Sequence, residues 1–363
     1  MIIPDVILNT QNLILAVNPG STSTKVALFD GDVLVVEETL RHSNSDLAVF
    51  NHYSEQLSYR INIVHDFLDR NKVEIKHLVA LVGRGGLMKP LSSGAYRVNE
   101  AMIADLRSGV YGEHASNLGA QIVYALAEAE GLPSFIVDPV SVDEFEEVAR
   151  YSGLPDLPRL SLVHTLNTRA IAHRHAKATG QKFTELNVVV AHLGGGLSIS
   201  PLKMGRIIDS NNANEGGPMS PERAGSLPSR QLAKLCLSGK YTPEEMLKLI
   251  AGKGGLTAHL GTNDLREAEK LADEGNTYAE KVLDAMFYQI GKEIGAVSTA
   301  LKGKCTAILL TGGMAYSELL VSRVKEYVEW IAPVFVYPGE DELSALAEGV
   351  WRALSGIEEA KQY

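Results

Sequence analysis

Four glycine-rich turns follow apolar, strand-like runs, and each could bring the backbone close to a phosphate group. They are NPGSTSTK (18–25), GRGG (83–86), HLGGG (192–196) and TGGMA (311–315). Glycine permits close approach of a ligand and exposes backbone N–H groups, which is how phosphate is commonly cradled. One such turn is more often structural than functional. Four in one chain favour a protein that binds phosphate.

The sequence lacks the best-known phosphate-binding signatures. It contains no G-x-x-x-x-G-K-[ST], no protein-kinase HRD…N or DFG set, and no G-x-G-x-x-G after a strand. The pattern therefore supports neither a P-loop fold, nor a protein-kinase fold, nor a dinucleotide-binding fold.

Strand-like and helix-like segments alternate along the chain, which predicts an α/β fold. The clearest helical period covers 277–302, where apolar residues recur every three or four positions, and a helix is also expected at 141–151. The strand-like runs are 12–17, 25–30, 32–37, 78–83, 134–138, 187–193, 197–202, 205–210, 307–313 and 334–339.

An internal repeat in the order of strands and turns predicts a duplicated fold. Near residue 12 a strand, a small-residue turn, a second strand, a tight turn and a third strand follow one another, and this order repeats near residue 187. Two strand-rich halves could also resemble each other by accident. The duplication predicts two domains with a cleft between them, one formed by 1–150 plus 342–363 and the other by 151–341.

Bulk composition limits the partners. The chain has 363 residues, of which 45% are hydrophobic, and a formal net charge of −10 without a basic block, which argues against nucleic acid. Cys236 and Cys305 make neither a disulfide framework nor a metal-binding spacing. The N-terminus shows no signal peptide, and no apolar run approaches the ~20 residues that span a bilayer. We expect a cytoplasmic protein with no membrane partner.

An ordered set of motifs resembles the acetokinase family within the actin/hexokinase-like (ribonuclease H-like) phosphotransferases. The motifs are ILAVNPGSTSTKVALFD, VVVAHLGGGLSIS, SPERAGSLP, ILLTGGMA and PGEDELSALAEG, and together they span nearly the whole chain. Acetate kinases typically carry Ala and Asn where this chain has Pro19 and Gly195. Those departures look like the butyrate and branched-chain fatty-acid kinase branch.

The resemblance implies an enzyme that transfers the γ-phosphoryl group of ATP directly and in line to a carboxylate, reversibly, giving an acyl phosphate. An ionised carboxylate needs no general base. The enzyme must instead overcome repulsion between two anions and align them. Such chemistry calls for arginines, a divalent metal and backbone N–H groups. By resemblance the nucleotide is ATP or ADP and the metal is Mg²⁺.

The resemblance assigns four catalytic residues, which are Arg84, Asp138, His164 and Arg223. Each has a plainer interpretation. The arginines could make surface contacts beside loops, His164 could be a core histidine, and Asp138 could cap the helix expected at 141–151. For Asp138 we favour positioning of Mg²⁺ or its water over proton abstraction, because the substrate is already ionised.

Arg84, His114 and Val163 are the expected substrate-binding residues. Acetate kinases usually have Phe at the position of Val163, before the histidine that matches His164. A smaller side chain would enlarge the acid pocket, where two methylenes are worth about 1–3 kcal/mol. Butyrate or isobutyrate is therefore expected, with acetate or propionate as the alternative. The histidines of AHRHA (172–176) are expected on a solvated helix face, and His114 could also be structural.

The resemblance places the nucleotide on residues from both halves. Lys25 could instead only extend from its strand, and His192 could be structural. The expected ATP-binding residues are Gly20, Ser21, Ser23, Lys25, His192, Gly194, Gly195, Gly196, Asp264, Arg266, Gly312 and Gly313.

The metal is expected at Asn18 together with an acid from the segment 340–342. Glu340 and Glu342 are favoured, but a one-residue gap leaves Asp341 open. Alternatively all three acids cap the last helix, where negative charge is favourable in any case.

Other functions of the same duplicated fold remain as rivals. The fold also hosts polyphosphate-type phosphohydrolases and sugar kinases, and a sugar kinase would need an acidic base against a neutral hydroxyl and would not depend on Arg84. An actin-type chaperone or filament protein would need long insertions. The family tends to form dimers or larger assemblies, so a homo-oligomer is expected.

Overall fold

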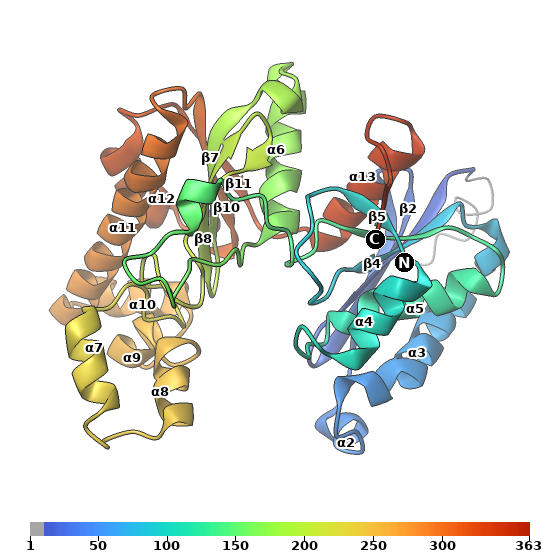
Figure 1. Cartoon of the computed structure of the whole chain (residues 1–363), viewed down its shortest axis with the longest axis horizontal. Helices are drawn as coiled ribbons and strands as arrows, with labels where there is room; N and C mark the ends of the chain where they lie inside the picture. Colours follow the sequence, from blue (N-terminus) through green and yellow to red (C-terminus); the bar gives the residue numbers. More distant parts are fainter. Residues whose placement is uncertain (1–10) are drawn as a thin grey trace. The chain divides into compact units, whose positions relative to one another are not determined.

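Two β-sheets, each with helices packed against it, organise residues 11–363, which the computed structural model describes (Figure 1). Contacts divide the chain into two units. The first contains the described residues up to Val142 together with Asp341–Tyr363, and the second is Asp143–Glu340. The expectation that the N-terminus carries no signal peptide concerns mainly residues 1–10, which lie outside the described residues.

The first unit is built on a seven-stranded sheet with the order β12-β5-β6-β4-β1-β2-β3. β1 pairs antiparallel with β2 and parallel with β4, and β6 continues the parallel part. The strands are β1 (Leu13–Pro19), β2 (Ser23–Asp30), β3 (Val33–Arg41), β4 (Ala80–Arg84), β5 (Ala95–Arg97), β6 (Ser134–Val137) and β12 (Lys361–Gln362).

Helices cover both faces of this sheet (Figure 1). Alternate residues of β1, including Leu15, pack with Phe67 of α3 and Leu118 of α5 in one buried cluster, while α13 contacts β1, β4 and β6. The helices are α2 (Asn44–Leu47), α3 (Leu57–Arg70), α4 (Glu100–Ser108), α5 (Asn117–Glu128) and α13 (Glu342–Leu354), with 3₁₀ turns η1 (Tyr53–Gln56) and η2 (Ile75–His77).

The second unit has a five-stranded sheet with the order β11-β10-β7-β8-β9. β7, β8 and β9 are antiparallel neighbours, and β10 and β11 extend the sheet in parallel from β7. The strands are β7 (Asn187–Leu193), β8 (Leu197–Lys203), β9 (Arg206–Ile207), β10 (Ala307–Gly312) and β11 (Val334–Pro338).

In this unit α11 packs against one face of the sheet and α6 against the other, because Val189 shares a cluster with α11 whereas Val188 shares one with α6. The helices are α6 (Thr165–Thr179), α7 (Ser229–Cys236), α8 (Pro243–Ile250), α9 (Gly255–Leu260), α10 (Leu265–Asp273), α11 (Thr277–Ser298) and α12 (Glu318–Val328). The 3₁₀ turns are η3 (Glu147–Arg150), η4 (Phe183–Glu185), η5 (Thr299–Leu301) and η6 (Gly313–Tyr316).

The two sheets share one plan. The order β3-β2-β1-β4-β6 in the first matches β9-β8-β7-β10-β11 in the second, with the same antiparallel and parallel pairings. The predicted duplicated α/β fold is confirmed. Among residues 11–363, no helix combines the length and apolarity that crossing a bilayer requires.

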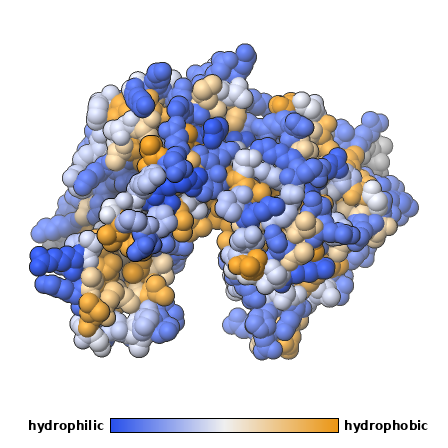
Figure 2. All heavy atoms as spheres, viewed as in Figure 1, coloured by the Kyte–Doolittle hydropathy of each residue, from blue (hydrophilic) through white to orange (hydrophobic). Residues whose placement is uncertain are grey.

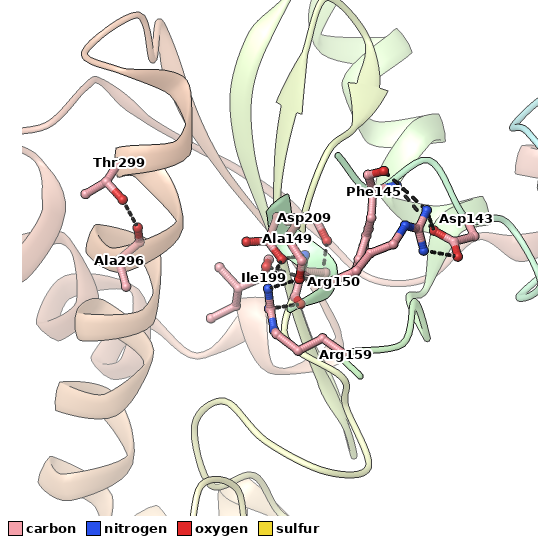
Figure 3. A network of polar contacts seen from close by, with 11 residues as sticks. Asp143, Phe145, Ala149, Arg150, Arg159, Ile199, Asp209, Ala296 and Thr299 are labelled. Carbon is pink, nitrogen blue, oxygen red and sulfur yellow. Dashed lines mark hydrogen bonds and ion pairs between the residues drawn. The ribbon is translucent and has the colours of Figure 1, made fainter. Parts of the chain in front are cut away.

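Two local expectations are wrong. Residues 141–151 form only the 3₁₀ turn Glu147–Arg150, because the Glu146 N–H donates to Ile208 O at 2.9 Å and Asp143 binds both Nη atoms of Arg150 (Figure 3). The run 205–210 forms a strand only at Arg206–Ile207. Beyond it Asp209 turns to an ion pair with Arg159 at 2.8 Å (Figure 3).

The histidine-rich part of α6 is not a solvated face throughout. His175 is 2% exposed, and its Nδ1 lies 2.9 Å from Tyr337 Oη on β11. Burial lowers the pKa of His175. The apolar neighbours Ala172 and Ala176 are also buried, so this side of α6 faces the sheet.

Candidate functional site

The β1–β2 hairpin presents polar groups at the carboxyl end of β1. Its turn is closed by a hydrogen bond from the Gly20 N–H to Ser23 O at 2.8 Å. Asn18 is directly opposite Lys25 in the strand register, so both side chains lie on the same face. Ser21 is exposed, whereas Ser23 and Lys25 are half-buried. The hairpin thus offers backbone N–H groups, hydroxyls and an ammonium group next to one another.

A carboxylate from the last long helix joins this hairpin to β4. Asn18 Nδ2 donates to Glu342 Oε2 at 2.5 Å, and the other oxygen of Glu342 pairs with Arg84 at the end of β4. Asp341 instead caps α13 by accepting the Ser344 N–H at 3.1 Å. Glu342 is thus the acid of this segment that is hydrogen-bonded to Asn18.

The positive charge of Arg84 also affects the pKa of His114. Partial burial of the imidazole, and then the charge of Arg84, lower the pKa of His114 below its ordinary value. His114 Nδ1 lies 2.8 Å from Ser116 Oγ. Two of the three predicted substrate residues are therefore close enough to influence each other.

Asp138 follows β6 and is 2% exposed. Its backbone has a positive φ of 41°, and its Oδ1 accepts the Gly94 N–H at 2.6 Å. The unusual backbone and the short hydrogen bond fix this carboxyl in place. It does not cap a helix.

The turn GRGG has a packing reason for its first glycine. A Cβ at Gly83 would lie 2.2 Å from the Gly119 carbonyl oxygen, so glycine is needed for α5 to approach β4. The sequence alone could not separate this role from phosphate binding.

The second unit places two of the predicted histidines face to face. The rings of His164 and His192 stack with centroids 4.0 Å apart and planes 13° apart. His164 Nδ1 lies 2.8 Å from Ser198 Oγ, and His192 Nδ1 lies 2.8 Å from Asn167 Oδ1. His192 Nε2 is 3.2 Å from Glu340 Oε1. Glu340 is therefore a neighbour of the histidine pair.

The glycine turn between β7 and β8 lies against the Arg223 loop. Ser220 Oγ donates to Gly195 O at 2.6 Å, and Arg223 Nε donates to Asn214 Oδ1 at 3.2 Å. A Cβ at Gly196 would lie 3.8 Å from His164 Cε1 and 3.9 Å from Arg223 Nε. The turn, the histidine pair and the arginine thus form one polar cluster.

A cavity of about 720 Å³ opens beside this cluster. Its walls include the predicted nucleotide residues Gly194, Gly195, Asp264, Arg266 and Gly313. Hydrogen bonds from Arg266 hold the pKa of Asp264 below its ordinary value. The cavity falls within the common size range of small-molecule sites.

Gly312, which precedes the cavity residue Gly313, allows a close approach of β10 to β7. It has a φ of +88°, and a Cβ there would lie 2.3 Å from Leu193 O. A side chain at Gly313, by contrast, would meet nothing within 4 Å. Gly312 is required by the fold, and Gly313 leaves open space.

Val163, the third predicted substrate residue, is 2% exposed. It packs with Phe145 and Ile171 in the core beside α6. Its side chain therefore acts through core packing next to His164.

Four supporting residues escaped the sequence interpretation. Ser198, Asn167 and Asn214 hold the rings and the guanidinium described above. The fourth is Arg60, which is completely buried and donates to Ser23 O at 3.1 Å. It lies four, seven and eight residues before the buried Val64, Phe67 and Leu68. This helical spacing places Arg60 on the buried face of α3 and could have identified it.

Magnesium suits the pair Asn18 and Glu342. Residues 11–363 contain no group of three or more His, Cys, Asp or Glu side chains placed to hold a metal ion. Mg²⁺ needs fewer protein ligands, since it commonly keeps several waters and binds one or two carboxylates plus substrate phosphates. An amide oxygen and one carboxylate fit that pattern.

Comparison with known proteins gives consistent results. The family model described as the acetokinase family matches residues 159–329. The chain is 50% identical to "Butyrate kinase 2" of Clostridium acetobutylicum over 351 residues, 96% of this chain and 99% of that protein. It is 51% identical to "Probable butyrate kinase 2" of Caldanaerobacter subterraneus over 350 residues, with the same coverage of both chains.

Solved structures share the fold at much lower identity. An acetate kinase from Porphyromonas gingivalis matches with a TM-score of 0.74 and 18% identity, covering 93% of this chain and 99% of that one. A propionate kinase from Francisella tularensis matches with a TM-score of 0.71 and 18% identity, covering 93% and 98%. These likenesses show the fold alone.

Proposed function

The chain belongs to the acetokinase family, and we propose that it phosphorylates a short-chain or branched-chain carboxylate, butyrate or isobutyrate, with ATP. The reaction is a reversible in-line phosphoryl transfer that yields an acyl phosphate and ADP. The observation that carries this proposal is the 50% identity to a butyrate kinase through 96% of the chain.

Charge neutralisation is the main task of the protein in this reaction. A carboxylate and a polyphosphate repel each other, and neither needs deprotonation at neutral pH. Arg84 and Arg223 each end beside a glycine-rich turn and can offer a planar fork to a carboxylate or phosphoryl group. We assign the acid substrate to Arg84 and His114, and the transferring phosphoryl group to Arg223 and His164.

The hydrogen bonds of Ser198 define which nitrogen of His164 carries a proton. Ser198 is fully buried, and its Oγ accepts the His164 backbone N–H at 3.3 Å. Within the described part of the chain its own hydroxyl proton then has one acceptor, His164 Nδ1 at 2.8 Å. With Ser198 donating to Nδ1, His164 would present an Nε2–H donor to a phosphoryl oxygen.

The nucleotide is assigned to the two phosphate turns and to the cavity of about 720 Å³. Ser21, Ser23, Lys25 and the turn amides would bind phosphate oxygens. Adenosine would enter beside Gly313, where the backbone leaves open space.

Mg²⁺, when bound, would neutralise phosphate charge at Asn18 and Glu342. Asp138 is held by the Gly94 N–H and is assigned to orient the metal or its water. Its burial makes it a fixed group and not a mobile proton acceptor. No step of the transfer requires a side chain to remove a proton from the acid.

The acid's chain length is assigned to Val163. We expect Val163→Phe to shift kcat/KM from butyrate toward acetate, because a larger ring packed in the core would press on the adjoining His164 and so narrow the space for the acid. Since Val163 is 2% exposed, overpacking is expected to lower stability as well. The ratio of the two substrates is therefore the measurement, with thermal denaturation as the control. An unchanged ratio in a folded variant contradicts this assignment.

Trapping the product with hydroxylamine tests the proposed function. Purified protein with ATP and Mg²⁺ is offered acetate, propionate, butyrate, isobutyrate or a sugar, and acyl phosphate is measured as hydroxamate. We expect butyrate and isobutyrate to be preferred. Preference for acetate or propionate would identify the alternative carboxylate kinase, and ADP formation with the sugar alone would identify a sugar kinase.

Arg223→Leu supplies the matched variant. We expect a loss of about 100-fold or more in kcat, the size seen when one donor to a transition-state charge is removed. Arg230→Leu removes a nearby exposed arginine on α7 and should leave the rate unchanged.

We also propose a homo-oligomer that acts in the cytoplasm, where ATP is available. Exposed leucines lie on and around α7 and α8, including Leu227, Leu237 and Leu247, and Figure 2 shows orange and tan surface in this part of the second unit. Apolar surface of this kind is common at subunit contacts. Light scattering of the purified protein measures the number of subunits, and a monomer would contradict the proposal.

A further inference from the structure

Arg60 is a buried positive charge directly beneath the β1–β2 hairpin. It lies on α3, its side chain is 0% exposed, and it is among the largest fully buried side chains. Its hydrogen bonds all end on neutral groups. Nε and Nη2 donate to Gln56 Oε1 at 3.1 and 2.8 Å, and Nη1 donates to Ser23 O and Thr24 Oγ1 at 3.1 and 3.0 Å.

No carboxylate in residues 11–363 forms an ion pair with Arg60. The ionisable groups that interact with it are His42, Tyr53 and Tyr59, and the exposed Asp46 acts on His42 and Tyr59. Burial, and then the charge of Arg60, lower the pKa of His42, which keeps that imidazole neutral at pH 7. The tyrosines are neutral at pH 7 as well, and arginine remains protonated in proteins. Within the described residues, the buried guanidinium therefore has no carboxylate as a direct partner.

An uncompensated buried charge is costly, and proteins normally supply a counter-ion. Here the guanidinium is hydrogen-bonded to the phosphate turn itself. The Ser23 carbonyl accepts both Arg60 Nη1 at 3.1 Å and the Gly20 N–H at 2.8 Å, so Arg60 also fixes the atom that closes the turn.

We propose that Arg60 is a positioning residue for the nucleotide, and that the polyphosphate of ATP is its missing counter-ion. Arg60 acts through the hairpin: it holds the Ser23 carbonyl and raises the positive potential at the Gly20–Ser23 turn. This inference deepens the function proposed above and rests on it. Its consequence is that Arg60 distinguishes ligands by their number of phosphates.

The sharpest variant is Gln56→Glu. Gln56 is buried, and its Oε1 already accepts two N–H groups of Arg60, so glutamate places a counter-charge there without a change of shape. We expect Gln56→Glu to fold and to weaken ATP binding about tenfold or more, because a nearby charge is cancelled at low dielectric. AMP binding should change by less than twofold.

Isothermal titration of the full chain with AMP, ADP, ATP and inorganic tripolyphosphate measures this dependence. Arg60→Met should show the same phosphate-dependent loss, and Arg60→Lys should restore part of it, since lysine keeps the charge but loses the fork. Arg169→Met is the matched control. It removes a buried arginine of α6 that is 5% exposed, and it should weaken all four ligands equally or not at all.

The outcomes separate the two proposals. If Gln56→Glu folds and leaves the ratio of ATP to AMP affinity within twofold of wild type, the assignment to Arg60 is overturned. A purely structural Arg60 would change the melting temperature but not this ratio. If wild-type protein forms no acyl phosphate from any acid, the proposed function fails, whatever the titrations give.

Discussion

Replacing Glu342 by glutamine tests the assignment of the metal and substrate side of the first unit. Each oxygen of this carboxylate has a partner, Asn18 at 2.5 Å and Arg84. Glutamine keeps the shape but places an NH₂ group against one of two donors and removes the counter-charge of Arg84. The variant therefore loses both the ion pair and one of the two carboxylate oxygens proposed for Mg²⁺.

The expected loss of stability follows from the exposed fractions of the two paired side chains. The side chains of Arg84 and Glu342 are 19% and 26% exposed, between a surface pair worth about 0–1 kcal/mol and a buried pair worth about 3–5 kcal/mol when one partner is removed. We expect a loss of about 2 kcal/mol, or about 4–8 °C in Tm for a unit of this size. The Mg²⁺ concentration for half-maximal activity should rise about tenfold.

Two neighbouring acids provide the controls. Asp341→Asn keeps the cap on α13, because asparagine caps as well as aspartate, and should change neither quantity. Glu340→Gln alters the partner of His192 in the second unit. If Glu340→Gln raises the Mg²⁺ requirement and Glu342→Gln does not, the metal assignment is reversed and our reasoning from the Asn18 contact is refuted.

Three further results are expected. Arg84→Leu should raise the pKa of His114 only part of the way to 6.5, since burial is the larger cause of its depression; NMR titration measures this, and full recovery would contradict it. Burial raises the pKa of Glu293 above its ordinary 4.5, so the wild type loses stability as the pH rises above about 4.5 toward 7. In thermal denaturation, Glu293→Gln should therefore be more stable than the wild type at pH 7 and equal to it near pH 4. Equal stability at both pH values would count against this expectation. Gly312→Ala should cost about 2–4 kcal/mol of stability, because its φ of +88° and the Leu193 carbonyl 2.3 Å from a Cβ leave no room; an unchanged Tm would be inconsistent with this.

Local patterns predicted the elements well. β7 was expected at 187–193 and is Asn187–Leu193, because an apolar run ended by glycines specifies a buried strand that stops at a turn. The helix expected at 277–302 is α11 with its 3₁₀ extension to Leu301. The helix expected at 141–151 failed because its backbone and charged groups bind distant partners, which a periodicity cannot reveal.

The polar contacts of the candidate site depend on residues far apart in sequence. Asn18 and Glu342 are 324 positions apart, and no spacing rule connects them. The one-residue alignment gap left three acids as candidates, and the choice among them depends on the packing of α13 against β1. Arg60 escaped notice because a lone arginine on an amphipathic helix is usually solvated, and burial without a carboxylate shows only in three dimensions.

The ion pairs suggest how an acidic chain can bind two anions. Arg84 is paired with Glu342, and Arg223 Nη1 lies 3.7 Å from Glu222 Oε2, so each of these guanidinium charges has an internal counter-charge. An incoming anion must share or replace that carboxylate, which makes binding at these arginines an exchange of partners. Arg60 has no carboxylate to exchange among residues 11–363. Its positive charge is therefore available to the hairpin at all times. We expect Arg60 to contribute more to polyphosphate affinity than its depth beneath the surface would indicate. High salt should reduce this contribution less than it reduces the contribution of exposed lysines, because a buried charge is screened less.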